Sequence, residues 1–319
     1  MPAIEISNLT KRFRDVTALD DMSFSVPEGE IFGFLGPNGA GKSTTINILL
    51  GFTQPTAGSA RVFGSDVRTE SKQVRQRTGA LLEGYGVYER ITAREHVERA
   101  IRAKDADDDP MAILERVGIP EAADRKAGGF SKGMRQRMAI GMALVGNPDL
   151  LVLDEPSTGL DPNGTRELRE VIREENRRGA TVFFSSHLID QVEAVCDRVG
   201  ILKNGEMVTE GSVTDLRAQL DAATVTVTVE RAAPPRCWPI YGGSTASRES
   251  RRPTTRFSSA HAGATPLRAL NAIERAGVGF ADFTTEDPSL EEIFEVATLG
   301  TRSGRERDGH AEAAPEGEA

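Results

Sequence analysis

The sequence has no long hydrophobic run and very few cysteines. Its longest apolar runs, Ile31–Leu35 and Leu150–Leu153, fall far short of the roughly 20 residues that a helix needs to cross a bilayer. The first residues mix charged and apolar side chains and lack the apolar stretch of a secretory signal. The two cysteines, Cys196 and Cys237, fit neither a disulfide framework nor a metal site. We therefore expect a cytoplasmic chain that reaches any membrane through a partner.

The chain also lacks an excess of positive charge. Its formal net charge is −9. This argues against general nucleic-acid binding, because phosphate backbones favour clustered Lys and Arg. The 319 residues, 38% of them hydrophobic and 27% charged, suffice for one large globular domain and a smaller one. We expect no nucleic acid among the partners.

Short apolar strands alternate with amphipathic helices over the first two thirds of the chain. Such alternation predicts a parallel α/β sheet. Residues 88–146 are predicted to be mainly helical, interrupted by an acidic turn at Asp105–Pro110. The strands are predicted at Ala3–Leu9, Met22–Val26, Ile31–Leu35, Leu150–Leu153, Thr181–Ser185 and Val199–Leu202, and the other helices at Lys42–Leu50, Thr165–Arg178 and Leu188–Val195.

The pattern changes near Asp215–Ala222, where we place the end of the first domain, residues 1–215. A smaller domain is expected over residues 216–300, with a strand at Thr224–Glu230 and helices at Pro266–Ala276 and Ser289–Thr298. Between them, residues 231–264 have almost no acids and no apolar period, so they are predicted to be irregular. Residues 236–262 are either a genuine insertion or the product of a compensated reading-frame error. The tail, 301–319, has the composition of a disordered segment.

A glycine-rich loop between a predicted buried strand and a helix carries the first chemical motif. The motif G-x-x-x-x-G-K-[ST] is matched by Gly36, Pro37, Asn38, Gly39, Ala40, Gly41, Lys42, Ser43 and Thr44. Its glycines let successive N–H groups point at phosphate oxygens, and the helix N-terminus adds its positive end. Lys42 would bind the β and γ phosphates, and Ser43 would bind Mg²⁺ through its hydroxyl.

Two acids follow the predicted strand at Leu150–Leu153. Because the ends of parallel strands line the ligand crevice of an open α/β sheet, Asp154 and Glu155 are expected beside the glycine-rich loop. Asp154 would hold Mg²⁺, and Glu155 would orient an attacking water. Acids at a strand end are common and often only cap a helix, so their significance depends on the neighbouring loop.

A third motif lies at Phe130–Arg137, where Ser131 can cap a helix and Gly133 permits close backbone approach. An ordinary helix cap explains this segment equally well when it is taken alone. In combination with the other motifs, it resembles the signature motif of ABC ATPases, with Lys132 in place of the commoner glycine and Met134 following. Ser157–Pro162, which includes Asp161, resembles the D-loop, whose alternative is a simple turn.

Three further positions complete the resemblance. His187, at the end of a predicted strand, resembles the switch histidine that contacts the γ-phosphate. Glu83 lies where the family usually has the Q-loop glutamine, and its role there is coupling or Mg²⁺ contact, unless it is a solvated loop acid. Phe13, before a turn expected at Asp20–Asp21, matches the aromatic that stacks on adenine, with core packing as the alternative.

The resemblance implies an ATP hydrolase with a P-loop NTPase core of the ABC type, a helical subdomain over about 88–146, and a small α+β C-terminal domain. ATP and Mg²⁺ would be bound by a head-to-tail homodimer in which each nucleotide contacts Lys42 of one chain and Ser131, Lys132, Gly133 and Met134 of the other. A separate integral-membrane permease is implied, with this chain peripheral on the inner face of the cell membrane. Ser289–Phe294 resembles the closing motif of drug-export-type (daunorubicin-resistance-like) subunits, which favours export. An importer and a soluble ABC ATPase remain alternatives.

Overall fold

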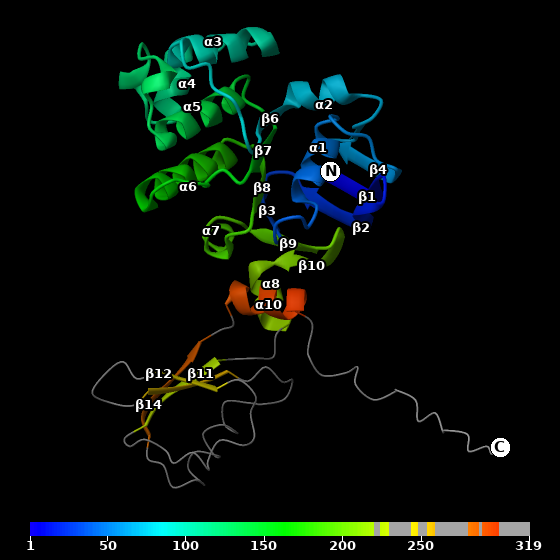
Figure 1. Ribbon diagram of the computed structural model, residues 1–319, viewed down its shortest axis with the longest axis vertical. Helices are drawn as coiled ribbons and strands as arrows, with labels where there is room; N and C mark the ends of the chain where they lie inside the picture. The colour runs from blue at the N-terminus through cyan, green and yellow to red at the C-terminus, as the bar shows by residue number, and fades with distance from the viewer. Residues whose placement is uncertain (220–223, 230–243, 248–253, 259–279, 287–288, 300–319) are drawn as a thin grey trace, which may run out of the picture.

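The computed structural model describes residues 1–219, 224–229, 244–247, 254–258, 280–286 and 289–299. The predicted helix Pro266–Ala276, the tail 301–319 and Cys237 lie outside these residues, as does most of 236–262. In Figure 1 the central sheet lies between a helical region, coloured cyan to green, and a second sheet, coloured blue, that contains the N-terminus. Among the described residues, no helix is long and apolar enough to span a membrane.

The central sheet contains six strands in the order β10-β9-β3-β8-β7-β6. All neighbours are parallel except β10, which pairs antiparallel with β9. The strands are β3 (Ile31–Leu35), β6 (Thr78–Leu81), β7 (Leu150–Asp154), β8 (Thr181–Ser186), β9 (Arg198–Lys203) and β10 (Glu206–Ser212). The predicted parallel α/β sheet is confirmed, whereas β6 and β10 were not predicted.

Both faces of the sheet are buried at β3, which explains why this strand has no polar side chain. Along β3, Ile31 and Leu35 face a core shared with the helical segment, while Phe32 and Phe34 face a second core. Phe24 lies on that second core, with its ring centroid 5.7 Å from Phe32 and 5.6 Å from Phe34. Alternating side chains along each strand therefore fix the sheet between two layers.

The second core is covered by an antiparallel sheet in the order β2-β1-β4-β5. It contains β1 (Pro2–Phe13), β2 (Val16–Pro27), β4 (Ala57–Val62) and β5 (Ser65–Asp66), and α1 (Lys42–Leu49) and α2 (Ser71–Arg77) lie beside it. The turn expected at Asp20–Asp21 was wrong, because both residues belong to β2 and the chain reverses at 14–15 instead. Asp21 has a φ of 48°, which marks a local irregularity where the β1–β2 register shifts.

The helical segment contains α3 (Ala93–Lys104), α4 (Pro110–Arg116), two short 3-10 turns (Pro120–Ala122 and Ala127–Gly129) and α5 (Lys132–Leu144). Two further helices, α6 (Pro162–Arg177) and α7 (Ile189–Glu193), follow β7 and β8. α6 begins three positions earlier than the predicted Thr165, because Asp161 accepts a bond from Gly164 N at 2.7 Å and Pro162 starts the helix.

The C-terminal elements are α8 (Val213–Gln219), a sheet in the order β12-β13-β11-β14, and α10 (Leu290–Leu299). The sheet contains β11 (Thr224–Val229), β12 (Ser244–Ser247), β13 (Thr254–Ser258) and β14 (Phe280–Glu286). The prediction that 231–264 is wholly irregular was wrong at β12 and β13, because backbone pairing needs no apolar period. α10 contacts α7 and α8, and Leu290 and Ile293 are buried in the core with the helical segment.

Candidate nucleotide-binding site

The glycine-rich loop joins β3 to α1 and is shaped by its glycines. Gly39 and Gly41 have φ values of 82° and 112°, which L side chains rarely adopt. A Cβ at Gly36 would lie 2.7 Å from the carbonyl oxygen of Leu202, and one at Gly41 would lie 2.7 Å from that of Ala18. Conformation and crowding therefore both require glycine, as phosphate binding by backbone N–H groups also does.

Lys42, the first residue of α1, is buried, whereas Ser43 beside it is exposed. The Lys42 ammonium donates to the carbonyl oxygen of Gly36 at 2.7 Å and lies 3.4 Å from Glu155 Oε1. The Lys42 ammonium thus lies between the backbone of the glycine-rich loop and Glu155, which directly follows β7.

The ends of three parallel strands meet at this position. Strand pairing places Leu35 opposite Ser186 and Asp154 opposite Ser185, so β3, β7 and β8 end side by side. Asp154 is buried, and its Oδ1 accepts from the Ser185 hydroxyl at 2.5 Å. The predicted meeting of the acids and the glycine-rich loop follows from this register. The sequence placed Ser185 at the end of a predicted strand but did not identify it as a partner of Asp154. Its polar side chain at the end of an apolar strand was the available signal.

Glu155 has a left-handed backbone, with φ 48°, although it is not a glycine. Its N–H donates to Ser185 O at 3.1 Å, and its Oε2 accepts from His187 Nδ1 at 2.8 Å. Oε1 is buried without a hydrogen bond, and the Lys42 ammonium is its nearest charge. Lys42, Glu155 and His187 are therefore joined by a line of polar contacts across the strand ends.

The signature segment, Phe130–Arg137, opens α5. Ser131 caps the helix by accepting from Met134 N at 3.2 Å, which confirms its predicted role as a helix cap. Ser131 and Lys132 are exposed. The Lys132 side chain lies against Gly159 of the D-loop, where an added Cβ would overlap it, and Leu160 approaches Gly133. Among the described residues, no hydrogen bond or ion pair links Ser131–Met134 to the glycine-rich loop.

Two other predicted positions lie at the rim. Glu83 follows β6, whose Leu81 pairs with Leu153, so it emerges at the same sheet edge as Asp154 and is exposed. Phe13 ends β1 with 47% of its surface exposed, and the ammonium of Lys11 lies 4.5 Å from the centre of its ring. The alternative that Phe13 is a core residue is therefore wrong.

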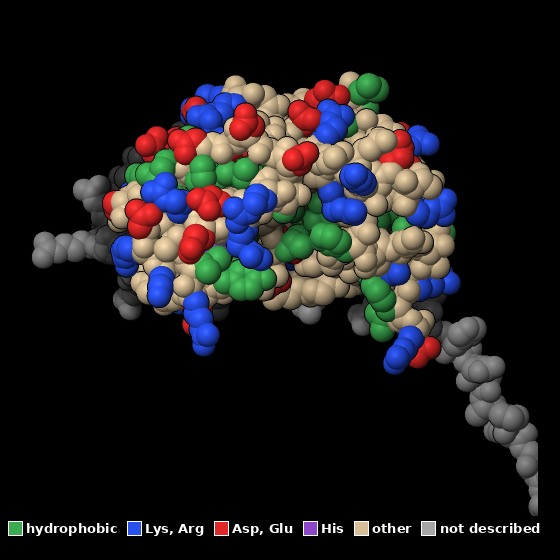
Figure 2. Space-filling model, turned by 90° about the horizontal axis from the view of Figure 1, so that it is seen from above, with side chains coloured by type: hydrophobic (Ala, Val, Ile, Leu, Met, Phe, Trp, Pro, Cys, Tyr) green, Lys and Arg blue, Asp and Glu red, His purple; other side chains and the backbone are tan. Residues whose placement is uncertain are grey.

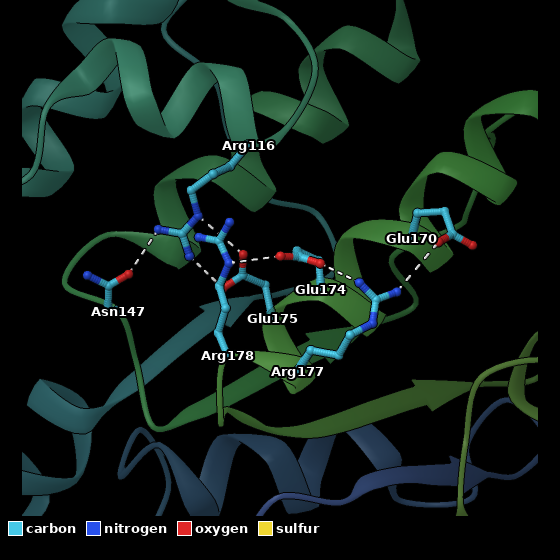
Figure 3. Close-up of polar contacts among 7 residues, drawn as sticks. All are labelled: Arg116, Asn147, Glu170, Glu174, Glu175, Arg177 and Arg178. Carbon is cyan, nitrogen blue, oxygen red and sulfur yellow. Dashed lines mark hydrogen bonds and ion pairs between the residues drawn. The ribbon is translucent and has the colours of Figure 1, made fainter.

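Sequence reasoning missed two buried connections behind the site. Gln136 on α5 joins Tyr85 to Pro156, as described below. Arg116 of α4 makes two bonds to Glu175 of α6, at 3.2 and 2.5 Å, and a third to Asn147 at 3.0 Å (Figure 3). Arg116 and Glu175 are 13% and 5% exposed. Because Arg116 and Glu175 are 59 residues apart in the chain, no local sequence pattern indicates that they pair.

The residues fit a Mg²⁺–nucleotide complex. Ser43 offers an exposed hydroxyl and Asp154 a carboxylate at the strand ends, both oxygen ligands of the kind that Mg²⁺ prefers. In the part of the chain that the structure describes, no group of three or more His, Cys, Asp or Glu side chains could hold a metal by itself.

Sequence comparison finds the same family over most of the site, from the glycine-rich loop to Glu155. The family model described as "ABC transporter" matches residues 19–158. The chain is 39% identical over 213 residues to the bacitracin transport ATP-binding protein BcrA of Bacillus licheniformis, covering 65% of this chain and 69% of that protein. It is 32% identical over 305 residues to the daunorubicin/doxorubicin resistance ATP-binding protein DrrA of Streptomyces peucetius, covering 93% and 92%.

Solved structures agree. An ATP-binding subunit of an ABC transporter superposes with a TM-score of 0.63 at 30% identity, covering 68% of this chain and 92% of that one. A dimeric post-hydrolysis ATP-binding cassette bound to ADP and phosphate superposes with a TM-score of 0.60 at 25% identity, covering 66% and 98%.

Proposed function

This chain belongs to the ABC transporter family, as one of its ATP-binding and ATP-hydrolysing subunits, and we propose that it powers export through a separate membrane permease. The observation that supports the catalytic part is the line of polar contacts that joins Lys42, Glu155 and His187 at the strand ends, directly beside the glycine-rich loop.

ATP would lie with its phosphates against the loop N–H groups and its γ-phosphate at Lys42. Glu155 Oε1, buried and without a hydrogen bond, is the acceptor that can orient the attacking water toward the γ-phosphorus. His187 donates to the other oxygen, so it fixes the plane of the carboxylate. Ser43, Asp154 and Glu83 would hold Mg²⁺, which neutralises charge on the phosphates. Phe13 offers an exposed ring for the adenine.

The nucleotide site is completed in this proposal by a second copy of the chain. Ser131, Lys132, Gly133 and Met134 present a helix N-terminus and a cation at the surface, which suits an anion brought by a partner. The D-loop, whose Asp161 caps α6, lies against Lys132 and would line the same interface. ATP would favour the closed homodimer, and hydrolysis would release it.

The permease would dock beside α3, on the face seen in Figure 2, where apolar side chains lie among charged ones. Tyr88, 62% exposed, follows Glu83 in the loop leading to α3. Its N–H donates to His96 Nε2 at 3.0 Å, and the guanidinium of Arg99 lies 4.9 Å from its ring centre. An exposed aromatic held in this way is preorganised for a protein partner. The chain would then be cytoplasmic and peripheral at the membrane.

The direction of transport is inferred from relatives. BcrA and DrrA, by their names, serve bacitracin transport and daunorubicin/doxorubicin resistance, and the second relative matches nearly the full chain, C-terminal part included. We therefore propose export as the direction of transport.

The test is the variant Glu155→Gln, which keeps the size of the side chain but removes its charge. It should abolish steady-state ATP hydrolysis, by about a hundredfold or more, while ATP binding persists. Glu206→Gln, the same substitution at an exposed glutamate on β10, is the matched control. Wild-type hydrolysis in Glu155→Gln would contradict the assigned role. Cells that gain no drug resistance when this chain and its permease are expressed together would contradict export.

A further inference from the structure

One buried amide connects three segments that the catalytic scheme above treats separately. Gln136, on α5, is 5% exposed. Its Oε1 accepts from the Tyr85 hydroxyl at 2.7 Å, and its Nε2 donates to Pro156 O at 2.5 Å. Tyr85 lies in the loop after Glu83, and Pro156 directly follows Glu155. A single side chain thus joins the loop beside α3, the signature helix and the residue next to the catalytic acid.

The bond to Pro156 falls where the backbone needs support. Glu155 is left-handed, and a residue that precedes proline is sterically restricted as well. Such a conformation persists only when its surroundings define it. Here three bonds do so: Glu155 N to Ser185 O, Thr158 N to Glu155 O, and Gln136 Nε2 to Pro156 O.

The bond from Tyr85 gives the Gln136 amide its second hydrogen-bond partner and fixes the orientation of that amide. A carbonyl oxygen only accepts, so Nε2 must face Pro156 and Oε1 must face the tyrosine. Burial raises the pKa of the Tyr85 hydroxyl, with the positive charge of Arg135 acting in the opposite sense. The phenol therefore keeps the proton that it donates.

We propose that Gln136 is a positioning residue for Glu155, and that through Tyr85 it links the geometry of the catalytic acid to the loop beside α3. Displacement of that loop by a partner would change the hold on Pro156 and so move Glu155 relative to its water. The proposal rests on the proposed ATPase function and adds to it an intramolecular route by which a bound protein changes the rate.

The test compares three variants of the full chain in ATP hydrolysis. Gln136→Leu removes both bonds and should lower kcat about tenfold with KM for ATP changed less than about twofold. Gln136→Glu keeps the acceptor for Tyr85 but loses the donor to Pro156. Its kcat should therefore be as low as that of Gln136→Leu. Tyr85→Phe removes only the hydroxyl and should lower kcat by a few-fold. Gln76→Leu, an exposed glutamine on α2, is the matched control.

The double variant Tyr85→Phe/Gln136→Leu separates a linked pair from two independent sites. Because the tyrosine acts through the glutamine, the double variant should be no slower than Gln136→Leu alone. If the losses of kcat in the two single variants multiply in the double variant, the two residues act independently and the proposed link is wrong. A fall in thermal stability and ATP binding without a selective loss of kcat would overturn the positioning role and leave a structural one.

Hydrogen exchange gives a readout that does not depend on turnover. The Thr158 and Leu160 amides donate to Glu155 O and Ser157 O, at 3.1 and 3.0 Å, and should exchange faster in Gln136→Leu. If Gln136→Leu changes neither amide exchange nor kcat, the positioning role is contradicted. Hydrolysis by the wild-type chain would in that case still support the proposed ATPase function. Absence of hydrolysis in the wild type contradicts the proposed function itself.

Discussion

The catalytic cluster (Lys42, Asp154, Glu155, Ser185 and His187) and the signature segment (Phe130–Arg137) both face phosphate in the proposed mechanism, yet they are held differently. Lys42, Asp154 and Glu155 are 6%, 4% and 8% exposed, and each contacts another member of the cluster. Ser131 and Lys132 lie at the surface, and their contacts are within their own helix or with the D-loop.

This difference shows how one chain divides the work. In the proposed mechanism, the lysine and the two carboxylates that act on ATP are buried and have polar partners, because an unpaired buried charge is costly. The residues proposed to bind the nucleotide of a second copy are exposed, so they are free to exchange solvent for that ligand. The buried Arg116–Glu175 pair then holds the helical segment, and with it the signature, against α6.

The largest effect on stability is expected from Glu175→Ala. Removing one partner of a buried, two-fold hydrogen-bonded ion pair leaves Arg116 uncompensated and should cost about 3–5 kcal/mol of unfolding free energy. Urea unfolding measures this cost. Asp124→Ala is the matched control, because Asp124 pairs with Arg94 at an exposed site and should leave the midpoint unchanged. Equal midpoints for both variants would contradict the contrast between buried and exposed pairs.

Lys42→Ala should produce the next largest effect. Loss of the ammonium at the γ-phosphate position should lower kcat/KM for ATP by about 10²–10³-fold. Because Lys42 is also the counter-ion of the buried Glu155 carboxylate, the variant should lower thermal stability as well. Steady-state kinetics and a thermal melt together check this. Activity within a fewfold of wild type would remove Lys42 from the mechanism.

Phe13→Ala should weaken nucleotide binding without affecting folding. Stacking of one base on an aromatic ring contributes about 1–3 kcal/mol, so KM for ATP should rise roughly five- to 100-fold at nearly constant kcat. Phe52→Ala changes a phenylalanine of similar exposure, 58%, and should leave KM unchanged. Equal values for the two variants would show that Phe13 does not touch the base.

The smallest effect is expected for Ser131→Ala, in its free energy of unfolding. Loss of a helix N-cap costs about 1 kcal/mol. The same variant should reduce hydrolysis more than this destabilisation alone explains, if the helix start also receives a partner's phosphate. Ser131→Thr, which retains a capping hydroxyl, tests the cap separately. If activity falls only in proportion to stability, Ser131 acts as a helix cap and not as a phosphate ligand.

Local chemistry sufficed to predict much of the cluster. A buried strand followed by a glycine-rich loop, and another ending in two acids, can only meet at the sheet edge when the strands are parallel. The same reasoning placed the helix at Lys42 and the strand before His187. It failed for Asp20–Asp21, where two acids resemble a turn but strand pairing with β1 prevails.

The sequence by itself determined the phosphate-binding loop, the acids and the alternation of strands and helices, because these depend on residues near one another in the chain. Tertiary structure decided that Ser185 bonds Asp154, that Gln136 joins Tyr85 to Pro156, and that Arg116 reaches Glu175. Those contacts link residues 20 to 59 positions apart. Only the packing of the layers brings them together, since no local preference encodes a long-range hydrogen bond.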